Sequence, residues 1–511
     1  MFDYIIVGGG SAGCVLAARL SEQPDATVLL LEAGGRDAKQ EIHVPAGWPK
    51  LLKSEVDWAF TTASQPELGT RSLYWPRGKV LGGSSSINAL IFTRGNRRDF
   101  GDFDRVETLF QRVEEAIGPS DAAPGHQLSR AFVEGCIAAG IPRNSGGFNG
   151  DEQEGAGFFH VSVRNGKRSS AAAAYLKPAA SRPNLTVRTG TSALRIVVDA
   201  GRAGAVVCGG GGVTETIRAR REIIVASGAI KSPHLLLLSG IGSADDLRGH
   251  GIAVVRDLPG VGRNLQDHLM GGVVHECTQP VTMDDAGTVK DIVQYLLTRR
   301  GRLRSNLAEA GAFVKVDSSA TRPDIELIFA PVFYMNHGFD NPKGYGFSIG
   351  AVLQHPHSTG SISLQSASPA DAPRIAPNYL ADARDLATLV AGVKLARRVA
   401  QGRPFDAYRG RELWPGPDAT SDEAIAAQVR ATAETLYHPI GTCRMGTDPM
   451  AVVGPDFRVH GVDGLRVVDA SVLPDHITGH PNAVVMMLAE RAAEAIKNPA
   501  MRNLEFGIWN A

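Results

Sequence analysis

A glycine-rich turn directly after the first apolar segment constrains this chain more than any other feature. Residues 2–7 have the composition of a buried strand, and Gly8, Gly10 and Gly13 follow in the spacing G-x-G-x-x-G before a helical segment at 14–20. A second apolar strand comes next, so the opening is a βαβ unit with a right-handed parallel crossover. Glycine lets the backbone approach a pyrophosphate at the helix N-terminus. The sequence therefore predicts a dinucleotide-binding α/β fold.

A carboxylate ends the second apolar strand, which covers residues 26–31. Glu32 lies 19 residues after Gly13, where a carboxylate can accept hydrogen bonds from both ribose hydroxyls. The glycine spacing alone is weak and does not separate FAD from NAD, but the flanking strands and Glu32 make it specific. The predicted contacts of this region with the cofactor are Gly8, Gly10, Ser11, Ala12, Gly13, Glu32 and Ala33.

Composition excludes several classes of protein. The 511 residues include 53 Lys and Arg against 53 Asp and Glu, so no net field favours nucleic acid or an anionic membrane. The five cysteines are scattered and form no C-x-x-C, which argues against a disulfide framework and against a zinc site; we predict no metal. Apolar runs such as 483–488 are far shorter than the ~20 residues that span a bilayer. With no targeting segment, we expect a cytoplasmic protein without membrane insertion.

Several longer motifs together resemble a known family. They include the Gly- and Ser-rich stretch RGKVLGGSSSINALIFTRG, the sequence GVGRNLQDH and the sequence LRVVDAS. In chain order, the matching stretches are 77–95, 228–242, 260–268, 437–446 and 465–471. Their sequences and their order resemble the glucose-methanol-choline (GMC) oxidoreductase family over nearly the whole chain, from residue 2 to about 497.

The resemblance implies that the dinucleotide is FAD. Backbone N–H groups of the loop around Gly82 and Gly83 suit phosphate and flavin oxygens. Some relatives carry a flavin-linking His immediately before Asn88, but here that position is Ile87, so we expect non-covalently bound FAD. The further cofactor contacts that the resemblance implies are Val80, Gly82, Gly83, Asn88, Ala89, Leu90, Asp469, Ala470 and Asn482.

Two histidines are the candidate catalytic residues. Alcohol oxidation needs an acceptor for the hydroxyl proton while hydride leaves the carbon, and imidazole suits this because its pKa lies near neutrality. His438, in Tyr-His-Pro, resembles the general base of the family, and His480, in Gly-His-Pro-Asn, resembles the residue that orients the alcohol. His268 is interpreted as structural. A helix beginning near Asn482 would present its positive end to the flavin.

The expected architecture has two parts. A Rossmann-like FAD-binding domain of the α/β class is assembled from 1–96, 165–270 and 430–511. An α+β substrate domain at 271–429 is an antiparallel sheet backed by helices. Residues 97–164 are predicted to be a connecting and lid region. Its beginning, 97–124, is shorter than is usual in the family, so we expect an abbreviated lid.

The resulting hypothesis is FAD-dependent oxidation of a primary alcohol to an aldehyde by hydride transfer to flavin N5. O₂ or another acceptor would reoxidise the flavin, so both alcohol oxidase and alcohol dehydrogenase stay open. An aromatic content of 6% does not favour a cage for the quaternary ammonium of choline. Two alternatives share the fold: an FAD-containing hydroxynitrile lyase using the same histidines in acid/base chemistry, and a light-driven fatty-acid decarboxylase. The sequence does not predict the oligomeric state.

Overall fold

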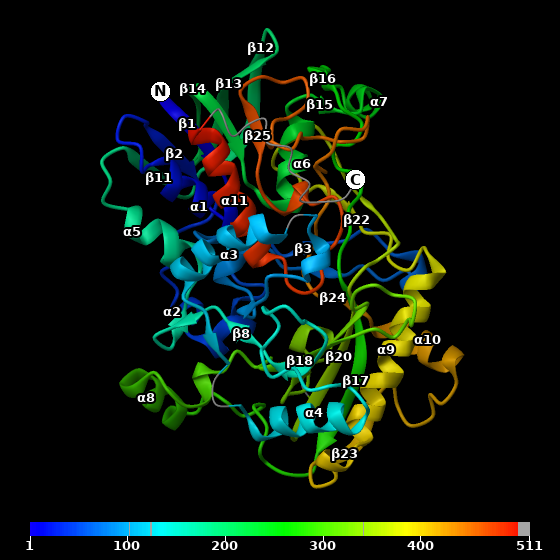
Figure 1. Cartoon of the computed structure of the whole chain (residues 1–511). Helices are drawn as coiled ribbons and strands as arrows, with labels where there is room; N and C mark the ends of the chain where they lie inside the picture. Colours follow the sequence, from blue (N-terminus) through cyan, green and yellow to red (C-terminus); the bar gives the residue numbers. More distant parts are fainter. Residues whose placement is uncertain (102, 123–124, 341, 499–511) are drawn as a thin grey trace.

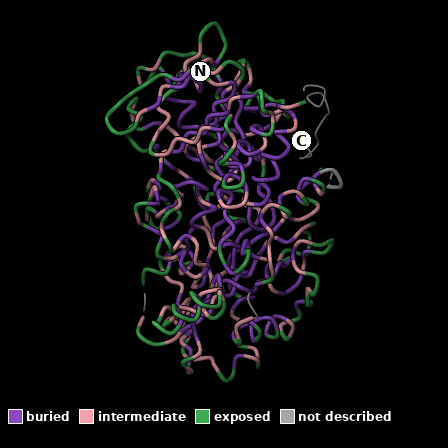
Figure 2. Tube along the Cα trace, turned by 90° about the vertical axis from the view of Figure 1, so that its left-hand side faces the viewer, coloured by how far each residue is buried: buried purple, intermediate pink, exposed green. Residues whose placement is uncertain are grey.

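Two β-sheets, one above the other in Figure 1, organise the molecule. The structure is a computed structural model that describes residues 1–101, 103–122, 125–340 and 342–498. Both sheets are enclosed by helices and loops, and buried residues, purple in Figure 2, occur in both halves, each of which has its own hydrophobic core cluster. The predicted architecture, a Rossmann-like sheet with an antiparallel substrate-domain sheet and helices, is confirmed.

The first sheet has the strand order β11-β2-β1-β14-β13-β12, with β25 beside β14. Pairings among β11, β2, β1, β14 and β25 are parallel, whereas β12, β13 and β14 form an antiparallel meander. β2 and residues 4–7 of β1 are continuous apolar runs and are entirely buried, as is typical of central parallel strands. The strands are β1 (Phe2–Val7), β2 (Val28–Leu31), β11 (Leu185–Arg188), β12 (Ser192–Asp199), β13 (Arg202–Gly210), β14 (Val213–Val225) and β25 (Leu465–Val467).

Three helices from distant parts of the sequence belong to this half of the molecule. The crossover helix α1 (Ser11–Leu20) packs beside the last described helix, α11 (Asn482–Lys497), and both are visible side by side in Figure 1. α6 (Gly228–Leu238) follows β14 and packs against β12. All but three of the residues of α11 are buried, so this helix is part of the core of the first half.

The second sheet is antiparallel, in the order β23-β17-β20-β19-β18-β7, with β24 beside β17. α9 (Ala383–Gln401), α10 (Asp422–Thr432) and α4 (Gln127–Ala138) cover one face. The strands are β7 (Gly155–Phe158), β17 (Leu269–Cys277), β18 (Ala310–Val314), β19 (Ile325–Ala330), β20 (Gly346–Leu353), β23 (Arg409–Trp414) and β24 (Glu434–Thr435).

Side-chain alternation gives the second sheet two different faces. Leu327 and Ala351 pack under α9, where Gly392 permits close contact because a Cβ there would lie 3.2 Å from the Cβ of Ala351. The neighbouring positions Ile328 and Gly350 point the other way and line a cavity. One face of this sheet is therefore core, and the opposite face is the floor of a site.

The stretch 97–164, predicted to be a connecting and lid region, contributes elements to both halves of the molecule. Its α3 (Phe103–Ile117) packs on α11 of the first half, burying Val106, Phe110 and Val113 at helical spacing. Its α4 and β7 belong to the second half. The segment is therefore divided between the two halves: the apolar face of α3 is covered by α11, and α4 packs on the second sheet, which β7 joins. Residues 102, 123 and 124 of the expected lid lie outside the described residues.

The remaining elements are short. The helices are α2 (Gln40–His43), α5 (Lys177–Ala179), α7 (Ala244–Gly249) and α8 (Val289–Thr298). The small strands are β3 (Phe60–Thr61), β4 (Tyr74–Trp75), β5 (Ile91–Phe92), β6 (Ser120–Asp121), β8 (His160–Val161), β9 (Val163–Arg164), β10 (Lys167–Arg168), β15 (Ile241–Gly242), β16 (Arg256–Asp257), β21 (Ser361–Ser363) and β22 (Arg374–Ala376). Within the described ranges, no helix combines the length and the apolar character that crossing a bilayer requires.

Candidate active site

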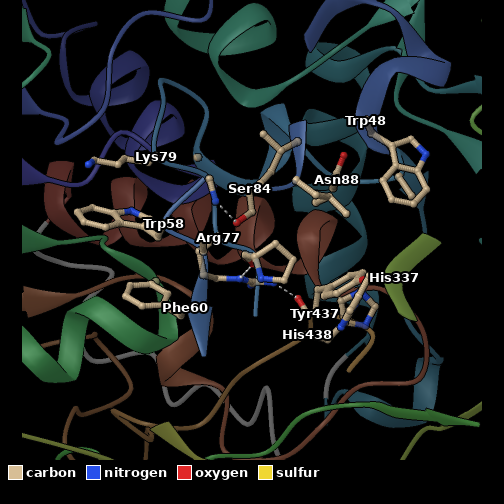
Figure 3. A pocket seen from close by; sticks show the side chains of 18 of the residues that line it. Trp48, Trp58, Phe60, Arg77, Lys79, Ser84, Asn88, His337, Tyr437 and His438 are labelled. Atoms are coloured by element: carbon tan, nitrogen blue, oxygen red, sulfur yellow. Dashed lines mark hydrogen bonds between the residues drawn. The ribbon is translucent and has the colours of Figure 1, made fainter. Parts of the chain in front are cut away.

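A cavity of about 1640 Å³ is lined by residues from both halves of the molecule. This exceeds the ~300–1,000 Å³ of ordinary small-molecule pockets, so a dinucleotide and a substrate can share it. In Figure 3, Trp48, His337, Tyr437 and His438 gather at one end, and Lys79, Trp58 and Phe60 lie at the other.

The glycine turn is built by close backbone approaches. Gly8 has φ +109°, and a Cβ there would lie 2.5 Å from the carbonyl oxygen of Ala226. A Cβ on Gly13 would lie 1.8 Å from the carbonyl oxygen of Gly8, so this glycine lets α1 pack against the turn. A Cβ on Gly83 would lie 2.7 Å from Gly10 Cα, so the two glycine loops meet at the cavity wall. No other residue type fits these positions without displacing backbone.

Helix N-termini converge on the same wall. Ser11 Oγ donates to Asn482 Oδ1 at 2.7 Å, which joins the first turns of α1 and α11. Both residues line the cavity, together with Gly228 at the start of α6. Free N–H groups and the helix dipoles make such a place favourable for an anionic group such as pyrophosphate.

Two buried carboxylates fix this end of the cavity. Glu32 accepts from the amides of Gly9 at 2.9 Å and Gly34 at 2.7 Å, and burial raises its pKa to about 7. Its remaining acceptor capacity is available to a ribose hydroxyl at the cavity wall. Asp469 accepts from the Gly228 amide at 2.8 Å and from Ser232 Oγ at 2.5 Å, so it ties the start of α6 to the segment after β25.

Most of the predicted cofactor contacts line the cavity. These are Gly8, Gly10, Ser11, Ala12, Glu32, Ala33, Gly83, Asn88, Ala89, Leu90, Asp469, Ala470 and Asn482. Gly13, Val80 and Gly82 lie behind the wall: Val80 is fully buried, and the Gly82 amide donates to the carbonyl oxygen of Gly9 at 2.7 Å. The glycine approaches, the converging helix N-termini and the buried Glu32 fit FAD.

His438 and His480 come together although 42 residues separate them in the chain. Their ring centroids are 4.8 Å apart and their planes are nearly perpendicular, at 83°. Asp267 Oδ1 accepts from the backbone amide of His438 at 2.7 Å, and the preceding residue, Tyr437, has φ +69°. Asp267 therefore stabilises the tight turn that directs His438 into the cavity.

Hydrogen bonds determine the proton position on His438. His268 Nε2 lies 3.0 Å from the carbonyl oxygen of Gln354, which only accepts, so Nε2 carries the proton. Nδ1 of neutral His268 is then an acceptor, and its 3.0 Å partner, His438 Nδ1, is the donor. This arrangement leaves Nε2 of His438 as an unprotonated acceptor, with no hydrogen bond to any described residue.

Burial keeps this histidine cluster neutral. The pKa of His438 and the pKa of His268 are held well below 6.5, mainly because burial disfavours the charged ring and secondarily because other histidines lie nearby. Burial also lowers the pKa of His476 to about 4; this ring stacks on His268 with centroids 3.6 Å apart. At neutral pH, His438 is therefore a neutral base.

His480 is held by a different set of partners. Its Nε2 lies 3.0 Å from Oε1 of Glu326, a fully buried carboxylate on β19, and its amide donates to Thr93 Oγ1 at 2.9 Å. Gln354 Nε2 donates to the second Glu326 oxygen at 3.2 Å. The imidazole is thus fixed in orientation beside His438.

Sequence reasoning missed several of these residues. His268 stood in the quoted motif GVGRNLQDH but was interpreted as structural, whereas its ring contacts His438 directly. Glu326 lies on β19 and Gln354 directly follows β20, and no sequence motif marks either residue. A polar residue inside an otherwise apolar strand is the signal that could have found Glu326.

The cavity beyond the histidines is largely apolar. Its walls come from the loops near β5, from η1 (Pro45–Leu51) and from the floor of the second sheet. The apolar residues at this end are Trp48, Leu90, Met270, Leu307, Ile328, Val332, Phe333 and Tyr334. Such walls favour a substrate whose body is hydrocarbon rather than charged.

A small polar network interrupts these walls near His438. The Tyr437 hydroxyl is 2.6 Å from the Tyr334 hydroxyl and 2.7 Å from His337 Nδ1. Glu434 accepts from the His337 amide at 2.9 Å, and burial raises its pKa to about 7. A carboxyl group with that pKa is only partly ionised at neutral pH, so it is a weak partner for a fixed cation.

No cluster of three or more His, Cys, Asp or Glu with the arrangement of a metal site occurs in the described part of the chain.

The glycine cradle and the paired histidines together define a flavin-type oxidoreductase.

Comparisons with known proteins agree with this class. Two family models, both described as GMC oxidoreductase, match residues 2–270 and 356–489. The chain belongs to the GMC oxidoreductase family. It is 41% identical to the alcohol dehydrogenase [acceptor] of Pseudomonas putida, over 97% of this chain and 96% of that protein. It is 40% identical to the mitochondrial choline dehydrogenase of Homo sapiens, over 99% and 92%.

Solved structures show the same fold. Pyridoxine 4-oxidase from Mesorbium loti superposes with a TM-score of 0.87 at 31% identity, over 97% of this chain and 99% of that chain. An Aspergillus oryzae formate oxidase variant superposes with a TM-score of 0.91 at 27% identity, over 99% of each chain. FAD is the cofactor expected for the family, and the residues that line the glycine end of the cavity fit it.

Proposed function

We propose that this protein oxidises a primary alcohol with an apolar body to the aldehyde, using FAD. The observation that carries the proposal is the free Nε2 of His438, an acceptor whose tautomer is set by His268 and which lies beside His480. A neutral imidazole in that position can take the hydroxyl proton of an alcohol.

His438 acts as general base, and its Nε2 accepts the proton from the hydroxyl group. His480, whose Nε2 lies 3.0 Å from Glu326 Oε1, is held beside His438 and orients the alcohol oxygen. When bound, FAD supplies the acceptor for the hydride at flavin N5. The apolar walls exclude water from the carbon centre during the transfer.

The cofactor is proposed to be held without a covalent link. Ile87, at the position where some relatives carry a flavin-linking histidine, is buried and cannot form such a bond. Ser11, Asn482 and the glycine turn would bind the pyrophosphate, and the start of α11 would place positive potential near the flavin.

The substrate class follows from the walls and from two relatives. The Pseudomonas putida relative is an alcohol dehydrogenase, and the human relative is a choline dehydrogenase. Trp48, Met270 and Ile328 give the substrate end an apolar surface, and Glu434 is only partly ionised at neutral pH. We therefore place hydrocarbon-rich primary alcohols ahead of choline. O₂ or another acceptor would complete the cycle.

Anaerobic titration of the purified FAD-bound protein with a panel of primary alcohols tests the proposal. Loss of the long-wavelength flavin band with aliphatic or aromatic alcohols, and little loss with choline, is the expected result. Admission of air then separates an oxidase, whose colour returns, from a dehydrogenase. A flavin that no alcohol bleaches would contradict the proposal and favour lyase-type acid/base chemistry at the same two histidines. FAD recovered in the supernatant after acid precipitation would support the non-covalent link.

A further inference from the structure

Helix α8 carries an exposed apolar face. Val289 and Leu297 are 79% and 80% exposed, and three further apolar side chains between them are also exposed. The five residues, at the spacing i, i+3, i+4, i+7, i+8, are Val289, Ile292, Val293, Leu296 and Leu297. Of eleven large hydrophobic side chains that are exposed among the described residues, these five form one continuous stripe. Scattered exposed hydrophobic residues are ordinary, but a contiguous stripe marks an interaction surface.

The helix itself is firmly attached. Thr288 and Asp291 form a capping box at its N-terminus, and Tyr295 donates its hydroxyl proton to the carbonyl oxygen of Gly166 at 2.8 Å. Asp291 and Tyr295 are the buried residues of the helix. Figure 1 shows α8 standing at the lower left edge of the molecule, away from the two sheets. The exposed stripe therefore belongs to an anchored helix.

Positive charge surrounds the stripe. Residues 289–304 contain five cations, Lys290, Arg299, Arg300, Arg302 and Arg304, against one anion, Asp291. Arg302 pairs with Asp285 and Asp291, and Arg299 lies over the Tyr295 ring at 5.2 Å. Lys290, Arg300 and Arg304 form no ion pair with any residue that the structure describes. This local excess stands out in a chain whose total formal charge is zero.

The same helix borders the cavity. Ile292 and Leu296 line it from α8, and Leu303 lines it from the adjoining η6 (Arg302–Arg304). Trp48 of η1, which lies against η6, belongs to the apolar end of the cavity. The exposed stripe thus continues into the wall of the substrate end.

We propose that α8 docks this protein on the surface of an anionic lipid bilayer. The stripe would lie in the boundary between headgroups and acyl chains, and Lys290, Arg300 and Arg304 would contact lipid phosphates. An amphipathic helix with flanking cations supplies both signals that reversible membrane binding requires. If the proposed alcohol oxidation holds, docking would place the apolar end of the cavity beside a bilayer in which hydrocarbon-rich alcohols dissolve; the docking itself does not depend on that activity.

Sedimentation with lipid vesicles tests the proposal on the full-length FAD-bound protein. Vesicles of phosphatidylglycerol and phosphatidylcholine should bind the protein, and pure phosphatidylcholine vesicles should bind it at least several-fold less. Salt at about 0.5 M should release it from the anionic vesicles, because exposed charges are then screened. A wild-type protein that stays in the supernatant with anionic vesicles would overturn the proposal.

Two pairs of substitutions locate the surface. Val293→Glu with Leu297→Glu should lower vesicle binding about tenfold or more, since neither side chain lines the cavity and both are exposed. Lys290→Glu with Arg300→Glu should remove the preference for anionic lipid. The matched control is Val213→Glu with Val254→Glu, which adds the same charge at two exposed valines of the other half. Equal loss of binding in the control and the α8 pair would refute the assignment to α8.

Light scattering distinguishes a lipid surface from a second copy of the chain. If α8 were a self-association interface, the wild type would be a dimer without vesicles and Val293→Glu with Leu297→Glu would be a monomer; that outcome contradicts the proposal. Turnover of a water-soluble alcohol should be unchanged in the α8 pair, whereas turnover of a vesicle-dissolved long-chain alcohol should fall several-fold. Absence of any alcohol turnover would contradict the proposed function and leave the vesicle result intact.

Discussion

The glycine end of the cavity is formed mainly by backbone groups, whereas the histidine end is formed by side chains. At the glycine end the cradle is formed by main-chain groups: a Cβ on Gly8 or Gly13 would lie only 2.5 or 1.8 Å from a carbonyl oxygen, so only glycine fits there. At the histidine end, the side chains of His438, His268 and Glu326 form the site. A backbone cradle requires glycines at a fixed spacing within one short segment. A side-chain cluster requires only that residues from distant segments meet in the folded chain. The first therefore leaves a continuous pattern in the sequence, whereas at the second end the motifs mark His438 and His480 but not their partner Glu326.

The largest effect is expected at the histidine end. His438→Ala removes the proton acceptor, so kcat for alcohol oxidation should fall roughly 10²–10⁴-fold while FAD stays bound. Anaerobic stopped-flow reduction of the flavin measures the rate directly. The matched control is His250→Ala. His250 hydrogen-bonds the carbonyl oxygen of Asp246, which lies on α7 away from the cavity, so this variant should react like the wild type. Flavin reduction at wild-type rate in His438→Ala would show that another group takes the proton.

A substitution at the glycine end should act on the cofactor instead of the chemistry. Gly8→Ala places a Cβ 2.5 Å from the Ala226 carbonyl oxygen at φ +109°, so FAD affinity should fall roughly ten- to a hundredfold. Fluorescence titration of the apoprotein with FAD measures the dissociation constant. Gly35→Ala, where nothing lies within 4 Å of the new Cβ, should bind FAD normally. Unchanged affinity in Gly8→Ala, with both proteins folded by thermal melting, would contradict the backbone argument.

A third substitution examines whether His268 positions the base. His268→Phe keeps a ring in place but removes the acceptor for the His438 Nδ1 proton, so the fixed tautomer is lost. We expect kcat to fall roughly tenfold with little change in KM, because substrate contacts remain while the base is misoriented. A steady-state pH profile should shift as well, which a purely packing role would not cause. A wild-type kcat and an unchanged pH profile would show that His268 has only a structural role and does not position His438.

The smallest effect is expected from pH. A base works in its deprotonated form, and the pKa of His438 is lowered well below 6.5 by burial. Its deprotonated fraction is therefore already near one at pH 6.5, and kcat/KM should vary less than about twofold between pH 6.5 and about 8. Activity should fall only on further acidification. An acid limb centred above pH 6.5 would show that the pKa of the base is not lowered.

The fold was largely accessible from sequence because its signals are local. The βαβ opening, the antiparallel sheet in the second half and the helix from Asn482 are confirmed, since apolar periodicity and the positions of Gly and Pro act over a few residues. The division of 97–164 between the two halves was not predicted, because an amphipathic helix such as α3 does not specify which surface covers it. A cytoplasmic location stays a prediction.

The site was accessible in part for the same physical reason. Gly8, Glu32 and Asn88 stand in motifs whose spacing follows from contact with a cofactor, and they line the cavity. The contact between Glu326 and His480 joins residues 154 positions apart, through the register of β19 and a loop before α11. No local pattern encodes that distance, so only the folded chain shows it.

The hydrogen bond between Ser11 and Asn482 spans 471 positions of sequence. The pyrophosphate cradle therefore needs residues separated by more than 450 positions, and Asp469 joins α6 to the same later segment. A polypeptide truncated before Asn482 would present the glycine turn without the second half of this cradle. Without FAD, α11 would still be held by its buried apolar side chains and by ion pairs such as that of Glu490 with Arg19, at 2.8 Å.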